Sequence, residues 1–316
     1  MNILVTGGAG FVGFHLTKKL LELNHNVIVI DNMNEYYDPK LKQSRLKLIK
    51  NKIKFYKIDI AKKDQLEKVF KKNKIDKICH LAAQAGVRYS IENPFVYADS
   101  NYKGTANILE FAKKYNINHV IFASTSSIYG NNKKIPFKEQ DRTDEPVSIY
   151  SASKRSCELL GFSYYKLFKM NFTAVRFFTV YGPYGRPDMA LFKFTKAMLN
   201  NQPIEVYNKG NMKRDFTYVT DIVDGFIAAI TKPNGFQIYN LGCGNPIKLM
   251  DFIKIIEQEL KVKAKIKMMP MQLGDVKLTY ADITKAKKIL KYKPKVMIKK
   301  GVKEFIDWYK EYYKIK

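Results

Sequence analysis

Residues 2–13 read NILVTGGAGFVG, and this stretch decides the fold. Its apolar start predicts a buried strand, and the helix expected after it has apolar positions at Phe11, Phe14, Leu16 and Leu20. The turn between them fits both G-x-G-x-x-G and G-x-x-G-x-x-G, through Gly7, Gly8, Gly10 and Gly13. Glycines there permit a tight turn and close approach of a pyrophosphate, to which the helix N-terminus offers free N–H groups. We expect a dinucleotide-binding turn rather than a purely structural one, and a first strand rather than a signal peptide.

A second apolar run, Val27–Ile30, ends in Asp31. This acid follows Gly13 by about 20 residues, the spacing typical of a carboxylate that binds ribose hydroxyls. No arginine follows it at Asn32 or Met33 to accept a 2′-phosphate. The pattern therefore favours NAD over NADP.

Strands and helices are expected to alternate through the first half of the chain. Further strands are predicted at 53–58, 77–83, 120–123 and 173–177, and helices at 64–72, 94–115 and 150–169. This alternation predicts an α/β fold with a doubly wound parallel sheet of the Rossmann type. Ligands bind at the carboxyl ends of such strands. Those ends carry Asp31, Asp59, the Ala83–Gln84 loop, Ser124 to Ser127 and the segment after Phe177.

The composition changes after Phe178 and becomes loop-like. We expect residues 1–177 to form the NAD-binding domain, completed by about 217–243. A smaller α/β substrate domain is expected from 178–216 and 244–316. Beyond residue 178, we predict helices at 192–200, 221–231, 250–260 and 301–313. We predict strands there at 236–241 and 265–269.

Composition excludes several classes of protein. Hydrophobic residues make up 46% of the 316, and no apolar run is long enough to predict a membrane span. Three widely spaced cysteines fit a reducing, cytoplasmic location, and the histidines show no metal-ligand spacing, so no metal is expected. The net charge of +27 makes nucleic-acid binding an alternative. Because the lysines are dispersed without an arginine-rich stripe, we expect no nucleic-acid partner.

Tyr150 and Lys154 form a candidate catalytic pair. Ser148 is a typical N-cap, so a helix should begin near Ile149 and place Tyr150 and Lys154 on one face. An ammonium ~5 Å from the phenol, at an effective dielectric constant of ~20, contributes roughly 3 kcal/mol. That would lower the tyrosine pKa by about two units, toward the range of a general base. The alternative is a surface Tyr and Lys one turn apart, which chance often supplies.

The chain resembles the extended short-chain dehydrogenase/reductase superfamily, in its nucleotide-sugar epimerase and dehydratase branch, nearly from end to end. The matching motifs are the glycine turn, Asp31, Ser124-Thr125, Tyr150-x-x-x-Lys154, Tyr181-Gly182-Pro183 and the segment 214–219. The resemblance implies that Tyr150 is the acid/base, that Lys154 lowers its pKa and holds the nicotinamide ribose, and that Thr125 binds the sugar O4. It implies NAD contacts at Gly7, Gly10, Phe11, Val12, Gly13, Asp31, Asn32, Asp59, Ile60, Leu81, Ala82, Ala83, Gln84, Asn101, Ser124, Tyr150, Lys154 and Phe177.

Two serines indicate which branch member it resembles. Dehydratases carry an Asp-Glu pair after the position of Thr125, and UDP-glucuronate decarboxylases carry Glu at the second position. Here the residues are Ser126 and Ser127, which favours epimerisation. The segments 82–90 and 176–190 look like UDP-glucuronate 4-epimerases, and Thr179 stands where UDP-galactose 4-epimerases usually have Asn.

The resemblance also implies the substrate contacts. Arg186 suits bidentate pairing with the carboxylate of a uronate, with Ser126, Ser127 and Thr179 donating further hydrogen bonds and Arg88 as a weaker candidate. The alternative for Arg186 is a diphosphate or structural contact. The uridine diphosphate end of the substrate is expected at Val206, Tyr207, Arg214 and Asp275. In the loop that carries Asp275, Leu273 replaces the proline usual in the family. A homodimer through the helices at 94–115 and 150–169 is implied as well.

The favoured hypothesis is an NAD-dependent epimerase that converts UDP-glucuronate to UDP-galacturonate, in polysaccharide biosynthesis. Within enzymes, the alternatives are a UDP-glucose or UDP-N-acetylglucosamine 4-epimerase and a UDP-glucuronate decarboxylase. From another class, the alternatives are a non-catalytic NAD-binding protein and a nucleic-acid-binding protein.

Overall fold

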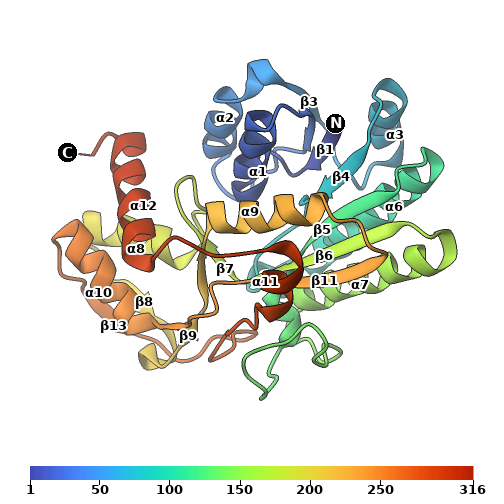
Figure 1. The fold of residues 1–316 in the computed structure, drawn as a ribbon. Helices are drawn as coiled ribbons and strands as arrows, with labels where there is room; N and C mark the ends of the chain where they lie inside the picture. Colours follow the sequence, from blue (N-terminus) through green and yellow to red (C-terminus); the bar gives the residue numbers. More distant parts are fainter. Residues whose placement is uncertain (316) are drawn as a thin grey trace.

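A seven-stranded parallel sheet forms the centre of the computed structural model, which describes residues 1–315 (Figure 1). The strand order β3-β2-β1-β4-β5-β6-β11 is that of a doubly wound sheet with one added edge strand. This confirms the predicted fold class. The strands are β1 (Asn2–Thr6), β2 (Asn26–Asp31), β3 (Ile53–Lys57), β4 (Lys77–His80), β5 (His119–Thr125), β6 (Asn171–Phe177) and β11 (Phe236–Leu241).

Helices cover both faces of the sheet because successive side chains of each strand point to opposite sides. Ile3 and Val5 of β1 join one apolar core, and Leu4 between them joins the other. The first core includes side chains from α1 (Phe11–Glu22), α9 (Val219–Ile230) and α11 (Thr284–Leu290). The second includes side chains from α3 (Lys63–Lys72), α6 (Gly104–Lys114) and α7 (Ile149–Phe168).

The helix that carries Tyr150 and Lys154 begins at Ile149, as predicted. The Ser148 hydroxyl accepts a hydrogen bond from the Ser151 N–H (3.1 Å), and the Ser151 hydroxyl accepts one from the Ser148 N–H (3.1 Å). This reciprocal capping box satisfies two amides that would otherwise lack partners. It fixes the start of α7 and therefore the position of Tyr150 one residue inside it.

The single helix predicted at 94–115 is instead three segments, α5 (Pro94–Tyr97), the π-helical η2 (Ala98–Lys103) and α6, preceded by the short α4 (Tyr89–Glu92). A π-helical turn adds a residue per turn and is frequent near functional sites. Asn101 lies in this turn and hydrogen-bonds across to Gln84 and Ser153. The apolar pattern could not reveal the extra residue.

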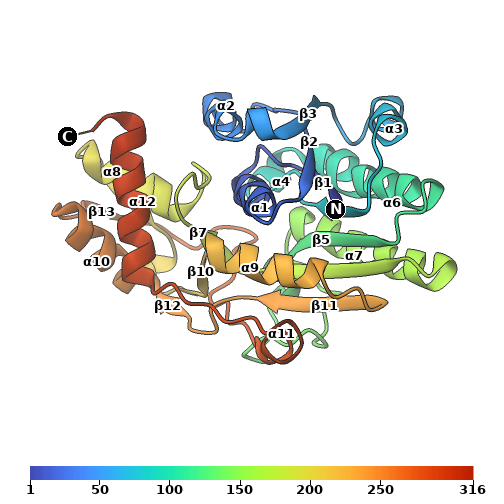
Figure 2. The same cartoon turned by 45° about the horizontal axis from the view of Figure 1, so that its top comes forward.

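A second group of elements lies to one side of the sheet in both views (Figures 1 and 2). Its helices α8 (Ala190–Leu199), α10 (Leu249–Leu260) and α12 (Ile298–Tyr313) share a third apolar core. Three two-stranded sheets accompany them, β7 (Thr179–Tyr181) with β10 (Phe216–Tyr218), β9 (Lys213–Arg214) with β12 (Ile247–Lys248), and β8 (Ile204–Val206) with β13 (Ile266–Met268).

The sequence did not predict α2 (Pro39–Lys47) or α11. After Pro39 at its start, helix α2 has only two apolar side chains, Leu41 and Leu46, so its periodicity is too weak to detect. Short 3₁₀ turns complete the chain at η1 (Lys50–Lys52), η3 (Ser126–Tyr129) and η4 (Tyr207–Gly210). Across residues 1–315, no helix is long and apolar enough to cross a membrane.

Candidate active site

A cavity of about 980 Å³ lies where the sheet's carboxyl edge meets the second group of elements. Parallel strands bring their carboxyl ends to one edge, which is why residues far apart in sequence share its wall. The wall includes every residue predicted to bind NAD or substrate except Asn101 and Val206. The predicted convergence on one edge is therefore what the structure shows.

The glycine turn leaves no room for side chains. A Cβ added at Gly13 would lie 2.1 Å from the Gly7 carbonyl oxygen, and one at Gly7 would lie 2.7 Å from the Ala82 nitrogen. Gly7 also has a φ of 72°, which favours glycine. Helix α1 begins just after this turn, with no acidic residue in its first turn. This backbone cradle fits the pyrophosphate of a dinucleotide.

Asp31 is held rigidly at the end of β2. Its Oδ2 accepts a hydrogen bond from the Ala9 N–H (3.1 Å), and its Oδ1 accepts one from the Met33 N–H (2.8 Å). The Lys42 ammonium lies 3.9 Å from Oδ1. Asp31 and Asp59 both line the cavity next to the glycine turn, in positions suited to the predicted adenosine contacts.

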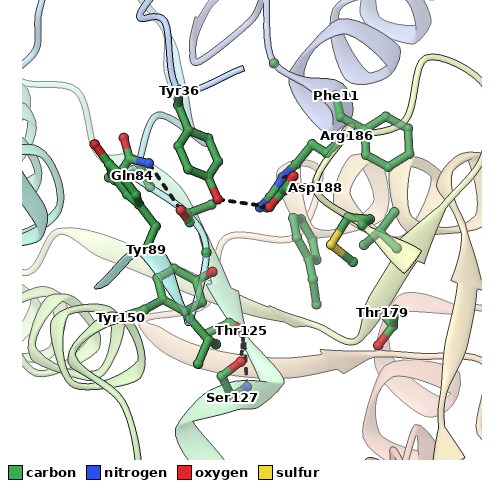
Figure 3. Close-up of a pocket in the computed structure, with 18 of the residues that line it drawn as sticks. Phe11, Tyr36, Gln84, Tyr89, Thr125, Ser127, Tyr150, Thr179, Arg186 and Asp188 are labelled. Atoms are coloured by element: carbon green, nitrogen blue, oxygen red, sulfur yellow. Dashed lines mark hydrogen bonds and ion pairs between the residues drawn. The ribbon is translucent and has the colours of Figure 1, made fainter. Parts of the chain in front are cut away.

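Tyr150 faces the cavity near Thr125 (Figure 3). Burial raises the pKa of Tyr150, and the positive charge of Arg186 and the Thr125 hydroxyl act in the opposite direction. Thr125 caps η3, since its Oγ1 accepts a hydrogen bond from the Ser127 N–H (3.2 Å). Phenol and hydroxyl are thus positioned together at one place on the wall, as an acid/base and a hydrogen-bonding partner require.

Lys154 does not act on Tyr150 in the way expected. Its ammonium lies 4.1 Å from the centre of the Phe122 ring, and it makes no hydrogen bond or ion pair with any of residues 1–315. Burial lowers the pKa of Lys154 to about 8, against the opposing effects of Cys157 and Glu158. Burial raises the pKa of Tyr150, and Arg186, rather than Lys154, is the cation whose charge opposes this rise. A buried ammonium without a protein partner nevertheless fits the ribose hydroxyls of a bound dinucleotide.

Arg186 is already paired. Its Nε donates to Asp188 Oδ1 (3.0 Å) and its Nη2 to Asp188 Oδ2 (2.5 Å). Tyr36 donates to the same Oδ2 (3.0 Å) (Figure 3). Thr179, Ser126 and Ser127 line the same cavity.

The residues expected to bind the uridine diphosphate lie together on another part of the cavity wall. Arg88 Nη2 lies 3.5 Å from Asp275 Oδ2, and its guanidinium lies 4.7 Å from the centre of the Tyr207 ring. Arg214 donates to the carbonyls of Lys213 and Lys277. Burial lowers the pKa of Arg214, opposed by the charge of Asp275. Arg88 therefore contacts Asp275 and Tyr207, which were predicted to bind the uridine diphosphate, in this structure.

Two residues predicted to contact ligands, Asn101 and Val206, do not line the cavity. Asn101 is 1% exposed and does not line the cavity, because its amide is used to hold the Gln84 main chain and Ser153. Val206 is fully buried in the third core, and its neighbour Tyr207 reaches the cavity instead. The structure brings together no group of His, Cys, Asp and Glu able to hold a metal ion among residues 1–315.

Residues 3–242 match the family model described as NAD dependent epimerase/dehydratase family. The chain belongs to that family. It is 45% identical to a UDP-glucuronate 4-epimerase from Thermodesulfobacterium geofontis over 311 residues, which cover 98% of this chain and 96% of that one.

Two solved structures are similar over 99% of this chain and 100% of the other chain. A UDP-glucuronic acid 4-epimerase from Bacillus cereus, in complex with UDP-glucuronic acid and NAD, has a TM-score of 0.94 at 34% identity. A UDP-glucose 4-epimerase from Thermotoga maritima has a TM-score of 0.92 at 31% identity.

The sequence did not single out several residues of the cavity wall, among them Tyr36, Lys42, Tyr89, Asp188 and Lys193. Of these residues, Asp188 could have been predicted from the sequence, because it follows Arg186 by two residues and could form an ion pair with it. Tyr36 could not, because it reaches Asp188 from a loop about 150 residues earlier in the chain.

Proposed function

We propose that this NAD-dependent enzyme is a 4-epimerase that interconverts UDP-glucuronate and UDP-galacturonate. This proposal rests mainly on the part of the cavity wall that surrounds Tyr150. It offers a largely buried cation, Arg186, and hydroxyls at Thr179, Ser126 and Ser127, but no carboxylate directly after Thr125. A carboxylate-bearing sugar would find both charge and hydrogen bonds there. The UDP-glucuronate 4-epimerases among the similar proteins support the same substrate.

Tyr150 performs the proton transfer in this mechanism. It takes the proton of the 4-hydroxyl while Thr125 holds that oxygen, and it returns a proton when the hydroxyl re-forms. Bound NAD supplies the hydride acceptor and donor at C4 and a positive charge near Tyr150. Lys154 holds the nicotinamide ribose. Between the two hydride transfers the 4-keto sugar turns over, so that the opposite face of C4 is reduced.

The same carboxylate creates a hazard, because a 4-keto uronate is a β-keto acid and can lose CO₂. Holding the carboxylate away from the geometry needed for C–C cleavage restrains this loss. We assign that role to Arg186 with Ser126, Ser127 and Thr179. Neither serine is an acid, so nothing at these positions supports elimination of water.

Incubation of the purified protein with UDP-glucuronate, followed by NMR, should reveal UDP-galacturonate. UDP-glucose in a parallel sample should be converted much more slowly. Preferential conversion of UDP-glucose would instead favour the UDP-glucose 4-epimerase alternative. Quantitative formation of a UDP-pentose would favour the decarboxylase.

Replacement of Arg186 with alanine should lower kcat/KM for UDP-glucuronate by at least about thirty-fold, because the substrate carboxylate loses the cation that pairs with it. The preference for UDP-glucuronate over UDP-glucose should fall with it, and NMR assays of both substrates measure the ratio. Arg142→Ala, which removes an exposed arginine paired with Asp144, is the control. An unchanged preference would contradict the proposed role of Arg186.

We propose further that residues 1–177 with about 217–243 bind NAD and that 178–216 with 244–316 bind the nucleotide sugar. Homodimer formation through α7 and the segment 94–115 is supported by exposed apolar side chains on both, including Leu159, Phe162, Phe95 and Tyr102. Sedimentation equilibrium should give twice the chain mass, and the mass of one chain would refute the dimer.

Cys79 and Cys157 are buried and unpaired, which supports a cytoplasmic location. Polysaccharide biosynthesis is the proposed pathway class, and loss of uronate from cell polysaccharide on gene deletion tests it.

A further inference from the structure

The guanidinium of Arg186 is held along one edge only. Nε and Nη2 both donate to Asp188, whereas Nη1 makes no hydrogen bond within residues 1–315. Arg186 and Asp188 lie between β7 and α8, and both line the cavity. A guanidinium has two such edges, and each can bind one carboxylate in bidentate fashion. One edge is therefore used by the protein, and the Nη1 edge remains for a ligand.

Asp188 is itself held by a residue from a distant segment. Tyr36, in the loop between β2 and α2, donates its hydroxyl hydrogen to Asp188 Oδ2 (3.0 Å), the oxygen that also accepts from Arg186 (Figure 3). The Tyr36 ring packs against Tyr89, with 4.9 Å between ring centres. The position of the hydroxyl depends on Gly86, because a Cβ there would lie 2.4 Å from the Tyr36 oxygen. Gly86 has a φ of 105°, so a side chain is disfavoured at this position for two reasons.

The protonation states agree with this geometry. Burial, followed by the charge of Asp188, raises the pKa of Tyr36 to about 12, so the phenol keeps its hydrogen and donates. Burial alone would raise the pKa of Asp188, but the Arg186 guanidinium outweighs it and holds the pKa below its usual value. Asp188 is therefore a carboxylate that accepts from both neighbours.

We propose that Asp188 and Tyr36 are positioning residues that fix the orientation of Arg186 and present its Nη1 edge to the carboxylate of the sugar. This inference rests on the proposed uronate substrate. A free arginine side chain has several rotatable bonds, and its freedom would have to be lost when the substrate binds. With Asp188 in place, that loss has already occurred on folding, and the partly buried cation has a counter-ion before substrate arrives.

Poor positioning should alter the products as well as the rate. In the 4-keto uronate, cleavage of the bond between C5 and the carboxylate carbon releases CO₂, and its electron pair moves into the enolate of the 4-ketone. Protonation of C5 then gives the 4-keto pentose, and the hydride taken from C4 stays on the enzyme as NADH. A carboxylate that Arg186 holds loosely reaches this geometry more often. Variants that loosen Arg186 should therefore release more CO₂ per epimerisation and accumulate NADH.

The test compares Asp188→Asn and Tyr36→Phe with the wild-type, NAD-loaded protein. Asp188→Asn should lower kcat/KM for UDP-glucuronate roughly ten- to a hundred-fold, and Tyr36→Phe roughly three- to ten-fold, as expected when hydrogen bonds of a charged group are lost. In both variants the ratio of UDP-4-keto-pentose to UDP-galacturonate should rise, measured by NMR together with NADH absorbance. The affinity for UDP, measured by calorimetry, should not change.

The controls are Asp307→Asn, an exposed acid paired with Lys303, and Tyr164→Phe, whose hydroxyl bonds Glu110 away from the cavity. Both should behave as wild type. An unchanged product ratio in Asp188→Asn and Tyr36→Phe would overturn the inference, whether or not the overall rate falls, since a general loss of folding lowers both products together. If wild-type protein does not epimerise UDP-glucuronate, the proposed function fails instead, and the two failures are distinguishable.

Discussion

Replacing Tyr150 with phenylalanine should lower kcat for UDP-glucuronate epimerisation by about a thousand-fold, in the range attributed to a positioned general acid or base. In the proposed mechanism the Tyr150 phenol carries the proton in both directions, and neither neighbour can replace it. Thr125 is an unactivated hydroxyl, and the Lys154 ammonium lies over the Phe122 ring. The substitution removes one oxygen from a side chain that faces the cavity, so folding and NAD binding should persist.

Two measurements separate lost chemistry from lost structure. The kcat is obtained by NMR of the product, and bound NAD is quantified after denaturing the purified protein. Tyr164→Phe removes a hydroxyl from the same helix, α7, where it bonds Glu110, and should retain wild-type turnover and NAD content. A Tyr150→Phe protein that retains more than a tenth of wild-type kcat would refute the assignment.

The sequence predicted the elements whose signals are local. The glycine turn, the alternating strands and the Ser148 cap each depend on residues within one turn or strand of each other, and all lie where they were expected. Because the strands are parallel, their ends then had to meet at one edge. The placement of Asp31, Asp59 and Thr125 in one cavity follows from topology, not from their individual contacts.

Side-chain direction was not predictable in this way. Helical spacing places Tyr150 and Lys154 on one face, but the ammonium turns to the Phe122 ring of β5, and sequence contains no information on that rotamer. Hydrogen bonds between side chains that are distant in the sequence were equally unpredictable. Arg186 was predicted to pair with the substrate carboxylate, with a structural contact as the alternative. One of its two hydrogen-bonding edges is used by Asp188, which Tyr36 holds from a remote loop.

The buried ion pair beneath the site was missed for the same reason. Glu158 of α7 and Arg176 of β6 are 0% and 1% exposed. Glu158 accepts from Arg176 Nε (3.0 Å) and Nη2 (2.8 Å), from the Ser124 hydroxyl (2.6 Å) and from Arg155 Nη1 (3.0 Å). This carboxylate therefore links the helix of Tyr150 to the strand end that carries Thr125.

Replacing Glu158 with glutamine should destabilise the protein by about 3–5 kcal/mol, measured by urea denaturation. The shape is kept, but Arg176 is left as a buried charge without a counter-ion. A double variant, Glu158→Leu with Arg176→Met, should recover part of this loss, because it removes both buried charges together. Asp144→Asn, which breaks an exposed pair with Arg142, should leave the urea midpoint unchanged. An unchanged midpoint in Glu158→Gln would refute the stabilising role of the pair.

The pH dependence provides an independent check with a defined sign. Burial alone would raise the pKa of Glu158, but the charge and hydrogen bonds of Arg176 outweigh it, so the folded-state pKa is lowered. A carboxyl whose pKa is lowered by folding contributes stability above its unfolded pKa of about 4.3 and loses it as pH falls through the folded value. The stability difference between wild type and Glu158→Gln should therefore be full at neutral pH and shrink in acid. A difference that grows as pH falls would mean that the carboxylate does not stabilise the fold through its charge.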